Sequence, residues 1–169
     1  DDSHTGELKL INSALKELRY SYRVFRPWVL RPKISIFGSA RTPEDHRDYI
    51  AAREFGRLMG EANWMSITGA GDGIMKAGHE GPGHESSFGL RIRLPFETTA
   101  NEVIAADPKL VNFQYFFTRK VMFLINSDAI AALPGGFGTM DEVFESLTLI
   151  QTGKSYPMPI VLLEGEGGS

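Results

Sequence analysis

The chain of 169 residues contains no cysteine. A disulfide framework, an iron–sulfur cluster and a thiol nucleophile are therefore excluded, and the absence is compatible with the cytoplasm. The sequence also lacks any apolar run near the roughly 18 to 20 residues that a membrane-spanning helix needs. Its acidic start, DDSHTGE, does not resemble the positively charged start of a secretory signal. We therefore expect a soluble, cytoplasmic protein with no membrane partner.

Charge of one sign is not concentrated anywhere in the chain. The 18 lysines and arginines and the 21 acidic residues are interleaved and leave a net charge of −3. Nucleic-acid-binding domains gather basic residues on one face, so we expect no nucleic-acid partner. A hydrophobic content of 42% in 169 residues can close one sizeable core but not two. We predict one domain over residues 1–169.

The chain opens with an amphipathic pattern. Between residues 8 and 26, apolar residues recur at three- and four-residue steps, which is the period of a helix, and Pro27 should end it. Because this helix precedes the first strand, we expect it to pack across the domain or against a partner subunit.

Short apolar segments that end in glycine turns and are followed by helices dominate the rest of the chain. Predicted strands lie at 33–37, 64–68, 88–94, 128–133 and 159–163, and predicted helices at 43–63, from about 74, at 113–126 and from Thr139 to Gly153. We expect the alternating strand at 88–94 to be half exposed near an edge, the helix at 113–126 to be buried on almost every face, and Thr139 to cap the last helix. This alternation predicts a Rossmann-like α/β fold, a doubly wound parallel sheet flanked by helices, with ligands at the carboxyl ends of the strands.

The last predicted strand is followed directly by GEGGS. A doubly wound domain usually covers such a strand with a further helix, so we expect that the natural protein continues or that the chain is a fragment.

Three glycine turns follow predicted strands. They contain Gly38 with Ser39; Gly69, Gly71 and Gly73; and Gly135, Gly136 and Gly138. Glycine lets backbone amides approach an anion closely, and the following helix adds its unpaired N–H groups, so phosphate binding is the physical interpretation. The middle turn, GAGDG, could equally be a tight strand-to-helix connection. The third turn, PGGFGTMDE, is more specific because it adds a hydroxyl and carboxylates to the glycines.

Charged residues near these turns are candidates for catalysis. Glu142 should lie about one turn inside the last helix, beside any phosphate-sugar held there, whereas Asp141 fits a charge that stabilises the helix start. Arg119 interrupts an apolar helix, where a charge is costly unless it is paired or functional. It could pair with Asp128 or Asp141, but a guanidinium also suits a phosphate or a catalytic carboxylate. Lys120 is a weaker candidate of the same kind.

Histidine and serine residues offer less. His79 and His84 flank a glycine-rich segment with neighbouring glutamates, but they show no recognised metal-ligand spacing, and a solvated loop explains them better. We predict no metal site. Ser39 has no nearby histidine base and no nucleophile-elbow motif, so a hydrogen bond to phosphate suits it better than nucleophilic catalysis.

At these residues the chain resembles the LOG (Lonely Guy) family of nucleoside-monophosphate phosphoribohydrolases, which activate cytokinins and are often labelled lysine decarboxylases. The matching segments are GSA at 38–40, GAGDGIMKA at 69–77, the pair Arg119-Lys120 and PGGFGTMDE at 134–142, within residues 33 to about 163. The phrases LPFE, YFFTRKVMF and LTLIQTGK resemble the longer bacterial branch of the family. Lys76 departs from that branch, which usually has glutamate there.

The resemblance implies hydrolysis of the N-glycosidic bond of a nucleoside 5'-monophosphate, such as AMP or an N6-modified AMP, without a cofactor. It also implies a homodimer or larger homo-oligomer. Arg119 and Glu142 would be the catalytic pair. The residues expected to bind substrate or phosphate are Ser39, Gly71, Lys120, Gly135, Gly136, Phe137, Gly138, Thr139, Asp141 and Thr148.

Two other functions compete with hydrolysis. A decarboxylase that uses pyridoxal phosphate needs a Schiff-base lysine and an acidic partner for the ring nitrogen, for which the motifs give little support. A non-catalytic carrier of a nucleotide or a molybdopterin-type cofactor could use the same glycine turns. Retention of both Arg119 and Glu142 favours the enzyme. The sequence does not specify the preferred base.

Overall fold

A computed structural model describes residues 3–95 and 99–167. Six parallel strands form one sheet in the order β4-β3-β2-β1-β5-β6. The strands are β1 (Lys33–Phe37), β2 (Met65–Thr68), β3 (Ser87–Ile92), β4 (Leu110–Phe113), β5 (Ala129–Ala132) and β6 (Ile160–Leu162). The helices are α1 (Ser3–Phe25), α2 (Arg47–Glu61), α3 (Ile74–Glu80), α4 (Phe116–Asn126) and α5 (Phe137–Gln151), with short 3₁₀ turns at Arg26–Trp28 and His84–Ser86. The predicted doubly wound parallel α/β sheet is confirmed.

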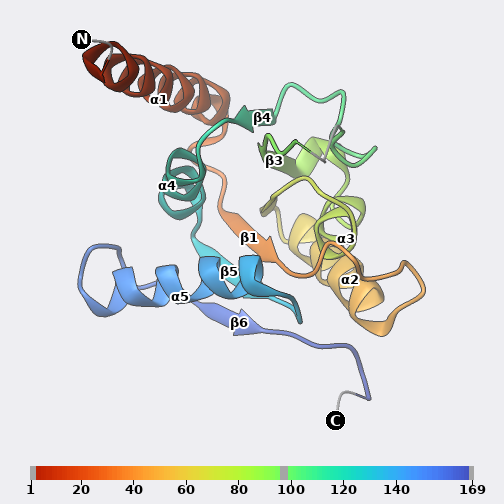
Figure 1. Ribbon diagram of the computed structural model, residues 1–169. Coiled ribbons are helices and arrows are strands. Elements are labelled where there is room, and N and C mark those ends of the chain that lie inside the picture. The colour runs from red at the N-terminus through yellow and green to blue at the C-terminus, as the bar shows by residue number, and fades with distance from the viewer. Residues whose placement is uncertain (1–2, 96–98, 168–169) are drawn as a thin grey trace.

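The strand order reverses between β1 and β5. From β1 the chain adds β2, β3 and β4 on one side, then returns to place β5 and β6 on the other (Figure 1). In this register Phe37 lies beside Ala132, so the two strands end level with each other. The loops that follow them run in different directions and leave a crevice between, which is where doubly wound sheets bind ligands.

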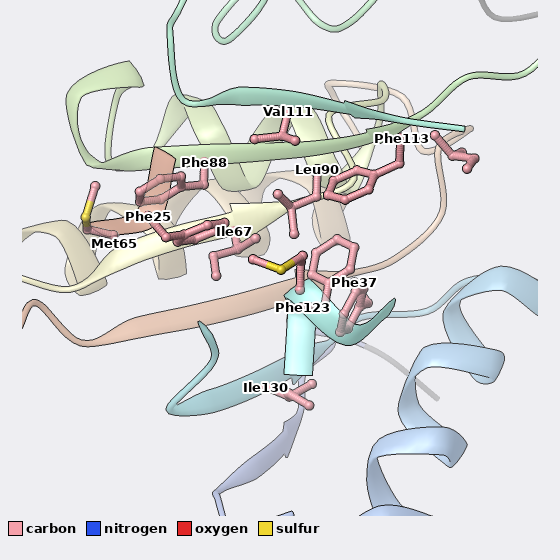
Figure 2. Packing of buried hydrophobic residues seen from close by; sticks show 12 residues of the cluster. Phe25, Phe37, Met65, Ile67, Phe88, Leu90, Val111, Phe113, Phe123 and Ile130 are labelled. Atoms are coloured by element: carbon pink, nitrogen blue, oxygen red, sulfur yellow. The ribbon is translucent and has the colours of Figure 1, made fainter. Parts of the chain in front are cut away.

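Helices cover both faces of the sheet. Side chains alternate along a strand, so neighbouring residues of β1 and β5 face different layers. On one face Ile34 and Ile36 pack against α2 and α3. On the other, residues of β2, β3 and β4 pack against α1 and α4 (Figure 2). There the rings of Phe25 and Phe88 stack with centroids 4.2 Å apart and join the end of α1 to the sheet.

The expectation for residues 88–94 was wrong in one respect. Strand β3 is not a half-exposed edge strand, because β4 pairs with it on its outer side and five of its six residues are buried. The sequence of β4 has only four residues with Asn112 among them, and the apolar run at 113–126 obscured it.

The helix predicted at 113–126 begins at Phe116 and is not buried on every face. Met122 and Phe123 face the core, while Phe116, Phe117 and Ile125 are about half exposed, at 53%, 51% and 51%. Helix α4 therefore presents an apolar surface that this chain does not cover.

Helix α1 is confirmed and begins earlier than predicted. Its carboxyl-terminal part packs beside α4, where Glu17 accepts hydrogen bonds from the Gln114 amide (2.6 Å) and the Thr118 hydroxyl (2.7 Å). Its amino-terminal part extends away from the sheet (Figure 1). There Leu8 and Ile11 are 67% and 53% exposed, so packing across the domain holds only for the last turns of the helix.

Within the described residues, no helix has both the length and the apolar character required to span a membrane. Two residues of the LPFE segment, Phe96 and Glu97, and the last two residues of GEGGS lie outside the described part of the chain.

Candidate active site

A cavity of about 520 Å³ opens at the carboxyl ends of β1, β2, β3 and β5. The three predicted glycine turns meet there, because parallel strands end at the same edge of the sheet. The lining residues are Phe37, Gly38, Ser39, Ala40, Arg41, Gly69, Gly71, Met75, Ile92, Leu94, Phe116, Arg119, Phe123, Gly136, Phe137, Gly138, Thr139 and Glu142. The cavity thus occupies the switch point of the sheet.

The amino-terminal end of α5 points into this cavity. Gly136 is the cap residue, and the first turn contains Phe137, Gly138 and Thr139. The first N–H groups of a helix have no acceptor inside the helix, and they carry the positive end of its dipole. The predicted cap role of Thr139 was wrong: it lies inside the first turn, and the helix has no side-chain cap. The end is left open for an anion.

The glycines of the third turn fall into two kinds. A Cβ atom at Gly135 would collide with the Thr139 hydroxyl and lie 3.0 Å from the Ser39 amide, so packing inside the protein requires glycine there. The Ser39 amide also donates to the Pro134 carbonyl (3.1 Å), which joins the turns after β1 and β5. At Gly136 and Gly138 a Cβ would meet nothing within 4 Å. Their bare backbone faces space that a ligand could fill.

Arg119 and Glu142 meet inside the cavity. Arg119 Nη2 lies 3.4 Å from Glu142 Oε1, and the two side chains are 14% and 9% exposed. The guanidinium carbon also lies 5.4 Å and 5.6 Å from the ring centroids of Phe116 and Phe123, within cation–π range. Arg119 therefore pairs with Glu142 and not with Asp128 or Asp141, the two alternative partners considered from the sequence.

Burial raises the pKa of the Glu142 carboxyl above the ordinary glutamate value, and the positive charges of Arg119 and Lys120 act against this rise. A carboxyl of this kind is a candidate acid, base or electrostatic group, because functional sites combine burial with a specific charged partner.

Lys120 and Asp141 do not line the cavity. Lys120 Nζ lies 2.5 Å from Asp141 Oδ2 and 2.6 Å from Glu145 Oε2, so this group joins α4 to α5 beside the Arg119 pair. The preferred interpretation of Asp141 as a charge at the helix start was wrong, because α5 has no acidic residue in its first turn and Asp141 lies beyond it, paired with Lys120. The substrate-binding roles of both residues stay predictions.

Thr148 lies on the exposed side of α5, where its hydroxyl donates to the Phe144 carbonyl (2.7 Å). It does not reach the cavity of its own chain, and its predicted role also stays a prediction. Gly135 is not among the residues that line the cavity, whereas Ser39, Gly71 and Phe137 are, and their binding of a ligand stays a prediction.

The middle turn, GAGDG, is both a tight connection and a cavity wall. Gly73 has φ +59°, and a Cβ there would collide with the Ser39 carbonyl, which accepts from the Ile74 amide (3.0 Å). At Gly69 a Cβ would lie 2.8 Å from Met75 Sδ and 3.6 Å from Arg119 Nη1. The turn therefore packs closely behind the guanidinium.

The sequence analysis missed the apolar part of the cavity and one positively charged residue, Arg41. The missed lining residues are Phe37, Ala40, Arg41, Met75, Ile92, Leu94, Phe116 and Phe123. Several of them stand at or just after the ends of predicted strands, and that position was the available signal. The sequence pattern indicated only that Phe116 and Phe123 belong to a buried helix.

His79 is not in a solvated loop. It belongs to α3 and is completely buried, because α3 continues to Glu80 and packs this side chain against Thr68 of β2 and Phe88 of β3. Among the described residues, no group of three or more histidine, aspartate or glutamate side chains is arranged to hold a metal ion.

Comparison with known proteins identifies the family. The family model described as "Possible lysine decarboxylase" matches residues 69–167, more than half of the chain. The chain belongs to this family. It is 31% identical over 122 residues to the cytokinin riboside 5'-monophosphate phosphoribohydrolase LOG3 of Arabidopsis thaliana, covering 69% of this chain and 54% of that protein. It is 27% identical to the probable enzyme of the same name, LOG4, of Oryza sativa subsp. japonica, covering 79% of this chain and 58% of that protein.

These relatives carry the LOG name that the motifs predicted. The chain spans little more than half the length of either relative. Its place in a bacterial branch stays a prediction.

Solved structures with the same fold include a cofactor carrier protein and a structural genomics target. The Moco carrier protein of Chlamydomonas reinhardtii has a TM-score of 0.55 at 24% identity, covering 79% of this chain and 76% of that one. The structural genomics target TM1055 has a TM-score of 0.59 at 24% identity, covering 81% and 76%. At this identity the likeness establishes the fold alone.

A substitution at Gly138 can separate the effect on anion binding from the effect on stability. Gly138→Ala fills open space and replaces glycine within a helix, so the free energy of unfolding should rise by about 0.5–1 kcal/mol or stay unchanged. Binding of AMP or inorganic phosphate should nevertheless weaken, because the methyl group occupies the anion's place. Chemical denaturation and calorimetric titration measure the two effects.

Gly135→Ala is the matched contrast, since its methyl group collides with Thr139 and should destabilise the protein. Unchanged phosphate affinity in Gly138→Ala would contradict an anion site at this helix start.

Proposed function

We propose that this protein hydrolyses the N-glycosidic bond of nucleoside 5'-monophosphates, AMP or N6-modified AMP, releasing the free base and ribose 5-phosphate. One observation carries the proposal. A buried carboxylate–guanidinium pair, Glu142 with Arg119, lies in the same cavity as the open amino-terminal end of α5. The first can stabilise a sugar cation, and the second can hold the sugar's phosphate.

The phosphate is bound at the start of α5. Backbone N–H groups of the first turn and the helix dipole favour a dianion there, and the bare backbone at Gly136 and Gly138 lets it approach closely. Ser39 lies on the neighbouring turn and lines the same cavity. Its hydroxyl, which accepts from the Arg41 amide (3.1 Å), can in turn donate to a phosphate oxygen.

Glu142 acts on the ribose. As the bond from C1' to the base nitrogen breaks, its electron pair leaves with the base and positive charge develops on C1' and the ring oxygen. A carboxylate beside this centre stabilises the charge and can accept the proton of the water whose oxygen bonds to C1'; the departing base nitrogen takes up one proton in return, so that water is divided between the sugar and the base. Glu142 lies beyond the first turn of the helix whose start would hold the phosphate, which supports a position beside the attached sugar.

Arg119 keeps the carboxylate ionised and oriented. Its positive charge opposes the rise in the Glu142 pKa that burial causes. The rings of Phe116 and Phe123 and the backbone of Gly69 confine the guanidinium, so its position is fixed before substrate arrives. Such preorganised charge is the main source of electrostatic catalysis.

The names of the sequence relatives agree with this chemistry, since LOG3 and LOG4 are named as phosphoribohydrolases of a riboside 5'-monophosphate. The description of the matching family model, possible lysine decarboxylase, suggests another reaction. Decarboxylation of an amino acid through pyridoxal phosphate requires a lysine for the Schiff base. Among the described residues, no lysine lines the cavity. Lys120 is held by Asp141 and Glu145, so the site does not fit that cofactor.

A carrier function is the second candidate, and the shared fold of the Moco carrier protein favours it. A ligand that ends in a phosphate would use the same start of α5. The buried Arg119–Glu142 pair has no evident use in a protein that only carries its ligand, which is why hydrolysis is preferred.

Glu142→Gln separates the two candidates. The substitution keeps the shape of the side chain but removes its charge, so base release should fall below detection while AMP still binds. Purified parent and variant are incubated with a panel of nucleoside monophosphates that includes an N6-prenylated AMP, and free base is measured by chromatography. Glu145→Gln, one turn away on the same helix, is the matched control and should retain turnover.

Normal turnover in Glu142→Gln would remove Glu142 from the mechanism. A parent protein that binds AMP but never releases base would favour the carrier.

The acid side of the pH–rate profile tests the ionisation of Glu142. The carboxylate must be ionised to act, so kcat/KM should fall as the pH drops through its pKa. Because burial raises that pKa, the midpoint should lie above the pH at which an ordinary glutamate titrates. Arg119→Gln removes a charge that lowers the pKa, so the midpoint of its residual activity should move to still higher pH. A midpoint at or below the ordinary glutamate value would contradict this assignment.

We also propose that the protein is a homodimer. Both helices that carry the ion pair, α4 and α5, expose large apolar side chains, among them Phe117 (51%), Phe144 (57%) and Leu147 (43%). An uncovered apolar face of this kind marks an association surface. Phe144→Glu should therefore halve the mass measured by light scattering, whereas Leu30→Glu, at a site that is 96% exposed after α1, should leave it unchanged. A monomeric parent would overturn the proposal. A cytoplasmic location stays a prediction.

A further inference from the structure

His79 is a buried titratable residue that the proposed mechanism does not use. Its side chain is 0% exposed, comes from α3 and does not line the cavity. Its ring contacts three segments of the chain, which are the end of β2, the start of β3 and the segment around Asn101, and Asn101 in turn binds the glycine turn at 69–73.

Both ring nitrogens of His79 have polar neighbours. Nε2 lies 3.0 Å from the Phe88 carbonyl oxygen and 3.0 Å from the Thr68 hydroxyl. Nδ1 lies 3.2 Å from the side-chain nitrogen of Asn101 and 3.4 Å from its side-chain oxygen, and Asn101 is only 4% exposed. The same Asn101 nitrogen donates to the Gly71 carbonyl at 2.9 Å. A chain of hydrogen bonds therefore runs from β3 through His79 and Asn101 to a residue that lines the cavity.

One protonation state satisfies this whole chain. The Phe88 carbonyl can only accept, so Nε2 must carry the proton that it receives. Nδ1 is then a bare acceptor, and Asn101 can give one amide proton to it and the other to Gly71. Burial lowers the pKa of His79 to about 4, in keeping with this neutral form. A protonated Nδ1 has no lone pair for the Asn101 side-chain nitrogen and could donate only to the more distant side-chain oxygen, so the ring would no longer bind the nitrogen that holds Gly71.

The turn that this network holds is strained. Ala70 has φ +63°, a left-handed conformation that residues other than glycine rarely adopt, and it is buried. Its amide donates to the Thr68 hydroxyl (3.0 Å), and its carbonyl accepts from the Asn101 amide (2.9 Å). Such a conformation persists only where the surroundings fix it. Thr68 and Asn101, whose side chains contact the His79 ring, also hold Ala70: Thr68 through its hydroxyl and Asn101 through its backbone N–H group.

We infer that His79 is a positioning residue of the active site: in its neutral form, through Asn101, it fixes the turn at 69–73 against Met75 and the Arg119 guanidinium. It does not touch substrate. Because this turn is a wall of the proposed active site, the kinetic consequence rests on the proposed function, whereas the effect on the turn does not.

Three variants test the inference. Asn101→Ala cuts the connection to Gly71. His79→Leu removes both ring contacts, whereas His79→Asn can place a carbonyl oxygen near the position of Nδ1 and keep an acceptor for Asn101. His84→Gln, at an exposed histidine outside the network, is the matched control. Amide hydrogen exchange of residues 69–73, AMP affinity by calorimetry, and kcat and KM are measured for each.

Asn101→Ala and His79→Leu should each speed exchange in the turn by about ten-fold or more, while β1 and β5 stay protected. AMP affinity and kcat/KM should fall by about ten-fold to a hundred-fold, as expected when a catalytic wall shifts by an ångström. The Asn101→Ala/His79→Leu double variant should lose no more AMP affinity or kcat/KM than either single variant, because both substitutions act through one connection. His79→Asn should recover slow exchange and AMP affinity, and His84→Gln should resemble the parent.

A purely structural His79 would give a different result. His79→Asn and His79→Leu would then be equally impaired, and Asn101→Ala would show parental exchange and AMP affinity; either finding overturns the inference. If the parent releases no base, the proposed hydrolysis fails, but hydrogen exchange and AMP affinity still decide the role of His79. If His79→Leu does not fold, the two single variants Asn101→Ala and His79→Asn still test whether His79 acts through Asn101.

Discussion

A carboxylate taken out of water needs a compensating charge close by, and the placement of Glu142 depends on this constraint. Its partner, Arg119, comes from a different helix, so α4 and α5 must lie side by side at the carboxyl ends of the strands. Lys120 with Asp141 and Glu145 joins the same two helices on the outer side. The fold brings these helices together because β5 returns next to β1, on the side opposite β2.

The glycines around the cavity divide between two tasks. Gly73 and Gly135 are required by the protein itself, since a side chain there would strike the neighbouring turn. Gly136 and Gly138 face open space and keep the helix start accessible. A carrier and a hydrolase could share the second feature, which explains how one fold can serve both. In the function that we propose, the buried ion pair is the feature that a hydrolase needs and a carrier does not.

Local patterns predicted well what depends on a short stretch of sequence. Strands β1, β2 and β5 and the three glycine turns follow from runs of a few residues. Strand β4 was missed because four residues with Asn112 among them carry too little periodicity. The exposed face of α4 was misjudged because the sequence does not show whether an apolar residue is covered by the chain's own core or is left at the surface.

The sequence by itself determined the fold class, the glycine turns that meet at the cavity and the two charged residues, Arg119 and Glu142, that line it. Only the tertiary structure decided their partners: that Arg119 faces Glu142 rather than Asp128 or Asp141, and that Thr139 lies within the helix. It also placed His79 in a buried network with Asn101, 22 residues away in the chain. The reason is physical. Backbone preference and hydrophobic period act over a few residues, whereas burial and charge pairing depend on which strands become neighbours.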